Sequence, residues 1–164
     1  MDSTLIDRIH GVIYGHAVGD ALGLGAESLS KHNISMYYPD GLTHYSQIVQ
    51  DFHRLHWPVG AWTDDTGQML CILDSLVEKR TVDVLDIAYR LHYWATHGGM
   101  GIGKTVYSVL NSPGFLWDPH SAAKKVWCYS CFKGFELFRV HALCHAVVKG
   151  RNKGVKGPGV QGLK

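Results

Sequence analysis

The sequence predicts an all-α protein, a compact bundle of several helices joined by long loops. Three observations support this class. Apolar residues recur every three to four positions in several separate segments, which is the period of an amphipathic helix. No segment shows the strict apolar–polar alternation of a strand. A chain of 164 residues can bury one core but is short for two domains of ordinary size.

The first predicted helix covers residues 3–23. Its apolar positions repeat with helical spacing, and a carboxylate, Asp20, lies near its end, where burial requires a partner or a bound cation. Glycine inside a helix costs about 1 kcal/mol relative to alanine. We therefore expect another element to pack closely against the glycine row of this helix and bury it. The row consists of Gly11, Gly15, Gly19 and Gly23.

A loop-like segment, residues 24–61, follows. Turn residues at 39–41 and 58–60 divide it, and Glu27 lies just after the first helix, where it can point back toward the helix end. Ordered loops of this length in a compact domain are often functional.

Four further helical segments complete the pattern. We predict one from Thr63 to about Lys79, and another from Thr81 to a stop at residues 97–99. A short segment runs from residue 101 to about 110, and the last covers 118–127 with Pro119 in its first turn. Apolar positions predict the buried side chains of the first two segments, which are Met69, Leu70, Leu73, Leu76, Val77, Val84, Leu85, Ala88, Leu91 and Trp94.

Residues 62–66, Trp-Thr-Asp-Asp-Thr, concentrate oxygen atoms where a helix is predicted to begin. The carboxylates of Asp64 and Asp65, flanked by the hydroxyls of Thr63 and Thr66, suit Mg²⁺ or Ca²⁺ better than a soft metal. The same residue types are also common at helix starts, where they cap N–H groups and meet the positive end of the helix dipole. These residues alone leave both interpretations open.

Residues 98–105, Gly-Gly-Met-Gly-Ile-Gly-Lys-Thr, match the pattern of a nucleotide-binding phosphate loop. That motif requires a buried strand before the loop and a long helix after it. Here the preceding residues have helical periodicity, and a turn at 111–114 follows closely. A nucleotide hydrolase is therefore the least favoured function, although a glycine-rich loop that opens a helix can still bind a phosphate.

Taken together, the motifs resemble the ADP-ribosylglycohydrolase family over about residues 3–127. The resemblance implies an all-α bundle around two Mg²⁺ ions, and hydrolysis of ADP-ribose from a modified protein side chain or a small conjugate. A non-catalytic member, binding ADP-ribose or resembling a lens crystallin, is the alternative. The matching stretches are residues 15–23 (ending Gly-Asp-Ala-Leu-Gly), Glu27, 38–42 (Tyr-Pro-Asp-Gly-Leu), 62–66 and 101–105.

The resemblance also implies roles for individual residues. Asp64 and Asp65 are expected to be catalytic, with a carboxylate taking a proton from the attacking water. Asp20 is expected to orient the metal ligands. Gly101 and Gly103 are expected to lie along the ADP-ribose. The expected Mg²⁺ ligands are Glu27, Thr63, Asp64 and Asp65.

The resemblance stops near residue 127. Family chains carry a later Asn-Gly-Ala-x-Met-Arg-like stretch and a second acidic cluster that completes both metal sites, and this sequence contains neither. We therefore expect residues 1–127 to be a partial family domain without its C-terminal half, of open activity. Residues 128–164 are expected to be an off-family extension, glycine-rich and basic, with seven Lys or Arg against a single Glu.

Two features of that extension give weaker indications. Cys128 and Cys131, with later histidines and Cys144, loosely resemble a zinc finger, but their spacing is too short. Apolar residues between 132 and 148 predict a helix that covers an open face.

Composition excludes several other classes. No apolar run is long enough to span a bilayer, and the N-terminus has no signal-peptide pattern. Four scattered cysteines do not make a disulfide framework. We expect a cytoplasmic protein with an ADP-ribosylated partner, and neither a membrane nor a specific nucleic acid as partner.

Overall fold

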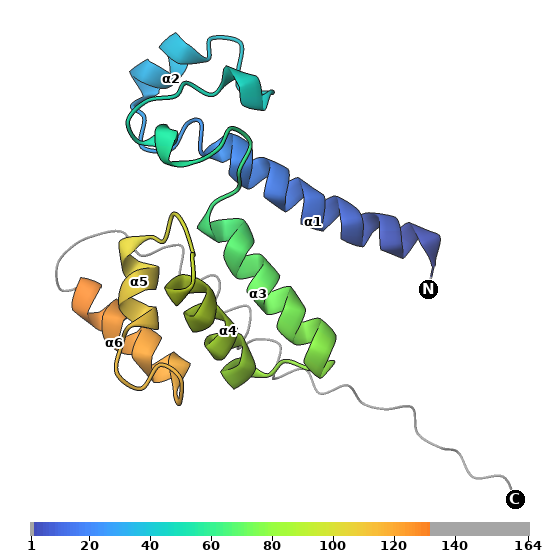
Figure 1. Cartoon of the computed structure of the whole chain (residues 1–164), viewed down its shortest axis with the longest axis vertical. Helices are drawn as coiled ribbons and strands as arrows, with labels where there is room; N and C mark the ends of the chain where they lie inside the picture. The colour runs from blue at the N-terminus through green and yellow to red at the C-terminus, as the bar shows by residue number, and fades with distance from the viewer. Residues whose placement is uncertain (1, 132–164) are drawn as a thin grey trace, which may run out of the picture.

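Residues 2–131 are described in a computed structural model of the chain. They form six α-helices and two short 3-10 segments with no strand among them, which confirms the predicted all-α class. Figure 1 shows α3 to α6 gathered together, whereas much of α1 extends away from them. Within this range no helix combines the length and apolar character needed to cross a bilayer.

The helix boundaries agree closely with the periodicity of the sequence. One helix was missed: α2 lies inside the predicted loop-like segment, where the Ser30 hydroxyl accepts a hydrogen bond from the backbone N–H of Asn33 at 3.1 Å. The 3-10 segments η1 (Tyr45–Gln47) and η2 (Arg54–His56) lie in the same segment. The α-helices are α1 (Ser3–Gly23), α2 (Lys31–Tyr37), α3 (Asp64–Lys79), α4 (Val84–Thr96), α5 (Lys104–Leu110) and α6 (Pro119–Cys131).

The main hydrophobic core lies where α4, α5 and α6 meet. Its buried members are Ala88, Val109, Leu110, Phe115 and Ala122. Phe115, in the turn between α5 and α6, joins Val109 and Leu110 of α5 and Ala122 of α6 in this core. The core therefore holds the α4–α5 loop in place from one side.

The α3 helix packs against α4 through a face of small residues. A Cβ atom at Gly67 would lie only 2.8 Å from the indole ring of Trp94, so these helices approach closely because glycine stands there. The predicted apolar stripe of α3 is wrong in part, since Leu70 is 36% and Val77 is 77% exposed. Leu85 of α4, predicted to be buried, is also exposed. The residues of α3 that are buried are Thr66, Gly67, Gln68 and Ser75.

The α1 helix contradicts the prediction that its glycine row is packed against another element. A Cβ atom added at any of the four row glycines would meet nothing within 4 Å. Ala21 is the buried residue of this helix. The apolar period correctly predicts the helix, but no described element covers its glycine row.

The expected extension falls mostly outside the described residues. Its first residues continue α6 beyond Trp127 to Cys131, and Cys128 is an exposed free thiol on that helix. Cys131 ends α6, whereas the later histidines and Cys144 of the zinc-finger-like pattern, and the predicted apolar helix, lie outside the described residues.

Candidate functional site

The candidate site lies where the C-terminal half of α1 meets the first turn of α3. A pocket of about 520 Å³ lies here, with walls from both helices and from the loop after α1. Four carboxylates line it, together with one histidine and no lysine or arginine, so the pocket is strongly acidic. The carboxylates belong to Asp20, Glu27, Asp64 and Asp65.

Asp20 joins α1 to α3. Its Oδ2 atom accepts hydrogen bonds from the backbone N–H groups of Thr63 and Thr66 at 3.0 and 2.9 Å. Thr63 stands at the N-cap position of α3, but its side chain makes no capping hydrogen bond. The start of α3 is therefore capped by the carboxylate of Asp20, 43 positions away in the sequence, and not by the side chain of Thr63.

The same carboxylate orients the Thr63 hydroxyl. Thr63 Oγ1 donates its hydrogen to Asp20 Oδ1 at 2.5 Å, and a hydroxyl oxygen also has two acceptor lone pairs. Burial alone would raise the pKa of Asp20, but the hydrogen bonds from Thr63 and Thr66 outweigh it and lower that pKa. Asp20 is therefore a carboxylate anion that takes the hydrogen of the Thr63 hydroxyl. The lone pairs of the Thr63 oxygen can then accept a hydrogen bond or bind a cation.

Asp64 has the opposite electrostatic character. Its carboxylate is half-buried, and burial, with the negative charges of Asp65 and Asp20, raises its pKa despite a hydrogen bond from Gly103. Two donors reach its Oδ2 atom, Gln68 Nε2 at 3.3 Å and the backbone N–H of Gly103 at 3.4 Å. A cation beside Asp64 would therefore be favourable.

Glu27 lies on the pocket wall but is paired elsewhere. Its Oε2 atom is 3.2 Å from Nε2 of His53, and both side chains are partly exposed. Asp64 and Asp65 thus share the pocket with a glutamate that is turned toward a histidine. Across residues 2–131, no three His, Cys, Asp or Glu side chains lie close enough together to hold a metal ion by themselves.

Arg54 holds the loop that carries Glu27, and no sequence motif marks this arginine. The side chain is 2% exposed, and Nε donates to the carbonyl oxygens of Leu24 and Gly25 at 2.9 and 3.1 Å. Its guanidinium also donates to the Glu27 carbonyl oxygen at 2.5 Å and pairs with the carboxylate of Asp51. The backbone after α1 is therefore tied to a buried cation.

The α4–α5 loop lies against the start of α3. A Cβ atom at Gly101 would lie 3.3 Å from Cβ of Thr63, and the residue has a φ of +77°, so both space and backbone favour glycine. Gly103 is the N-cap of α5, which is only seven residues long and follows helix α4. Helices thus flank this loop where a nucleotide-binding phosphate loop needs a preceding strand.

Comparison with known proteins agrees with these motifs. A family model described as ADP-ribosylglycohydrolase matches residues 1–151, and so extends past residue 127, where the sequence resemblance becomes hard to follow. No solved structure shows a significant match.

Three curated relatives have names that refer to ADP-ribosyl groups. ADP-ribosyl-[dinitrogen reductase] glycohydrolase of Rhodospirillum rubrum is 36% identical over 60% of this chain and 32% of its own length. ADP-ribosylarginine hydrolase Tri1 of Pseudomonas putida is 29% identical over 65% of this chain and 26% of its own. ADP-ribosylhydrolase ARH3 of Danio rerio is 29% identical over 71% of this chain and 29% of its own. The chain spans about a quarter to a third of the length of these relatives. Because the family model matches more than half of its residues, the chain belongs to the ADP-ribosylglycohydrolase family.

Proposed function

We propose that the acidic pocket is part of a Mg²⁺-dependent site that hydrolyses ADP-ribose from an ADP-ribosylated protein side chain or a related conjugate. The observation that carries this proposal is the half-buried Asp64 carboxylate, packed beside Asp65 and Asp20 in a pocket lined by no lysine or arginine. The names of the relatives support the chemical class of the substrate.

The donor atoms at the pocket fit magnesium. The Thr63 hydroxyl and the carboxylates of Asp64 and Asp65 offer only oxygen, the ligand type that Mg²⁺ prefers. Glu27 would join this set on leaving His53, and further ligands would complete the two-ion site that the family resemblance implies. Bound Mg²⁺ supplies Lewis acidity and lowers the pKa of a coordinated water.

The residues of the pocket have different roles in the proposed reaction. Asp65 is exposed to the pocket, and we assign it to accept the proton of the attacking water. Hydrogen bonds from Gln68 and the backbone N–H of Gly103 hold the Asp64 carboxylate, which suits a metal ligand of fixed position. The backbone at Gly101 and Gly103 carries no side chain that would keep an ADP-ribose away from this end of α3.

The direct test is release of ADP-ribose. The purified chain would be incubated with Mg²⁺ and an ADP-ribosylated peptide, and free ADP-ribose would be measured by chromatography with mass detection. We expect release that is abolished by chelation and by Asp64→Asn or Asp65→Asn, and retained by Asp74→Asn, an exposed carboxylate further along α3. Release that survives either site substitution would contradict the proposal. ADP-ribose binding without release would favour the non-catalytic alternative.

A further inference from the structure

Gln68 reaches back one helical turn to Asp64. Its Nε2 atom donates to the Asp64 carbonyl oxygen at 3.0 Å and to Asp64 Oδ2 at 3.3 Å. The residue is only 8% exposed. A buried amide with both of its described hydrogen bonds to one residue is strongly constrained in position, because an unpaired buried donor is unfavourable.

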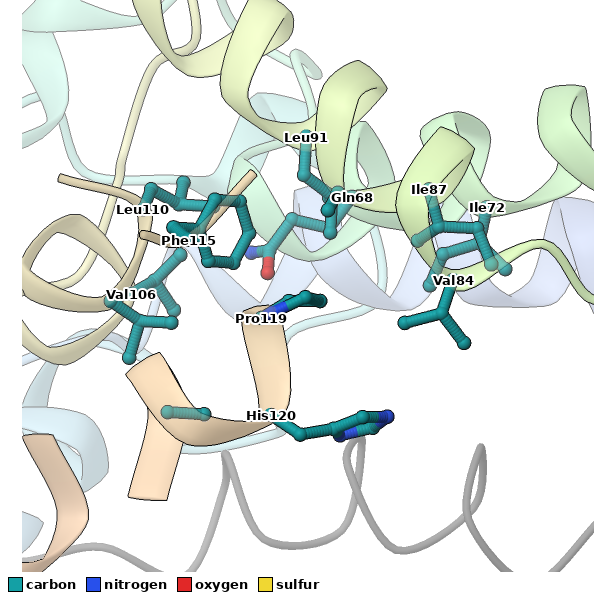
Figure 2. A pocket seen from close by; sticks show the side chains of 13 residues that line it. Gln68, Ile72, Val84, Ile87, Leu91, Val106, Leu110, Phe115, Pro119 and His120 are labelled. Atoms are coloured by element: carbon teal, nitrogen blue, oxygen red, sulfur yellow. The ribbon is translucent and has the colours of Figure 1, made fainter. Parts of the chain in front are cut away.

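The rest of the Gln68 side chain is confined by apolar neighbours. It lines a cavity of about 130 Å³ between α3, α4, α5 and α6, and Figure 2 shows it between Leu91, Phe115 and Pro119. Apart from His120, the other side chains that line this cavity are apolar and offer the amide N–H no alternative acceptor. The cavity wall therefore favours the rotamer that points the donor at Asp64.

The two donors that reach Asp64 share one carboxylate oxygen. Gln68 and Gly103 both bond to Oδ2, and no other described residue donates a hydrogen bond to Oδ1. Neighbouring Asp65 and Asp20 repel this carboxylate and do not hold it. The donor on Oδ2 thus sets the direction in which Oδ1 points.

We propose that Gln68 is a positioning residue that fixes the Asp64 carboxylate so that Oδ1 is presented to the acidic pocket for a divalent cation. This inference rests on the proposed function and names a residue outside its ligand set. Removing partners that orient a metal ligand typically lowers metal affinity by about 10–100-fold.

The test compares Gln68→Met with wild type and with Ile87→Val. Methionine keeps the length of the side chain but has no donor, whereas Ile87 lines the same cavity with the same 8% exposure and has an apolar side chain that cannot donate to Asp64. Titration calorimetry with MgCl₂ should show about 10-fold weaker binding for Gln68→Met and unchanged binding for Ile87→Val. Turnover of the variant should recover at high Mg²⁺, which a general packing defect would not allow.

A second measurement uses the wild-type chain and needs no substitution at Gln68. The side-chain amide signal of Gln68 in an ¹⁵N–¹H spectrum should shift on Mg²⁺ addition, and should do so less in Asp64→Asn. Equal Mg²⁺ affinity for wild type and Gln68→Met, or an unmoved amide signal on Mg²⁺ binding, would overturn the positioning role and leave the proposed function standing. A wild-type chain that binds no Mg²⁺ would overturn both.

Discussion

Replacing Asp20 separates the stability of the fold from the chemistry of the pocket. Asp20→Ala removes the cap of α3 and the partner of the Thr63 hydroxyl. Loss of an N-cap costs about 1–2 kcal/mol. The hydroxyl bond to a charged acceptor adds about 1 kcal/mol after discounting for partial exposure. We expect a loss of about 2–3 kcal/mol in the free energy of unfolding, and a Tm lower by roughly 5–10 °C.

Asp20→Asn should give a different result. The remaining amide oxygen can still accept from the N–H groups of Thr63 and Thr66, so we expect the stability loss to stay within about 1 kcal/mol. The new NH₂ group cannot accept the Thr63 hydroxyl hydrogen, which must turn elsewhere. Mg²⁺ affinity should therefore fall by about 10-fold while the fold remains.

Thermal unfolding followed by circular dichroism and titration calorimetry with MgCl₂ would measure the two effects. Asp7→Asn, an exposed carboxylate on the same helix, is the matched control. An unfolding free energy of Asp20→Ala within about 0.5 kcal/mol of wild type, the range of ordinary surface substitutions, would refute the capping argument.

Three further predictions concern packing, the loop and pH. Gly67→Ala should destabilise the chain by about 1–3 kcal/mol because its Cβ would lie 2.8 Å from the half-buried indole ring of Trp94. Gly11→Ala, with open space around it, should stabilise α1 by about 0.5–1 kcal/mol. Arg54→Ala should cost at least about 2 kcal/mol and expose residues 24–61 to limited proteolysis, because it leaves buried carbonyl oxygens without donors. The hydrogen bond from Arg90 lowers the pKa of Asp86 to about 2 from 3.8, so the stability that this carboxylate contributes is present above about pH 4 and is lost as pH falls toward 2.

Each of these has a clear contrary outcome. Equal denaturant midpoints for Gly67→Ala and Gly11→Ala would show that contact with the indole does not limit the α3–α4 packing. Wild-type proteolysis rates in Arg54→Ala would show that the loop is held by other contacts. If Asp86→Asn unfolds in acid with the same pH dependence as wild type, protonation of this carboxylate does not contribute to the acid unfolding.

Periodicity predicted the helices well but predicted their buried faces less well. The bounds of α1 match the expected segment, yet its glycine row is open. In α3 the apolar Val77 is exposed while Ser75 is fully buried. Apolar spacing indicates which face of a helix can be buried. Which face is buried in the fold depends on the element that packs against the helix. Here α4 packs on small residues of α3, because the indole ring of Trp94 in α4 fills the space beside Gly67.

The structure places several motif residues close together, but the motifs did not reveal how those residues are held. Gly101 lies close to Thr63 and Asp64 at the start of α3. Arg54 and Gln68 have no motif of their own, because a single arginine in a loop or a glutamine in a helix has no distinctive spacing. The pairing of Glu27 with His53 depends on the path of the loop between them, which local sequence does not specify.

The bond between Asp20 and the start of α3 also has a consequence for the order of folding. It closes a loop of 43 residues, so the first turn of α3 gains its cap only after a non-local contact has formed. The pocket and the docking of α1 therefore arise in one event, and opening of that docking releases the amides of Thr63 and Thr66 together. Hydrogen exchange at these two amides would report how often the assembled pocket opens in the native protein.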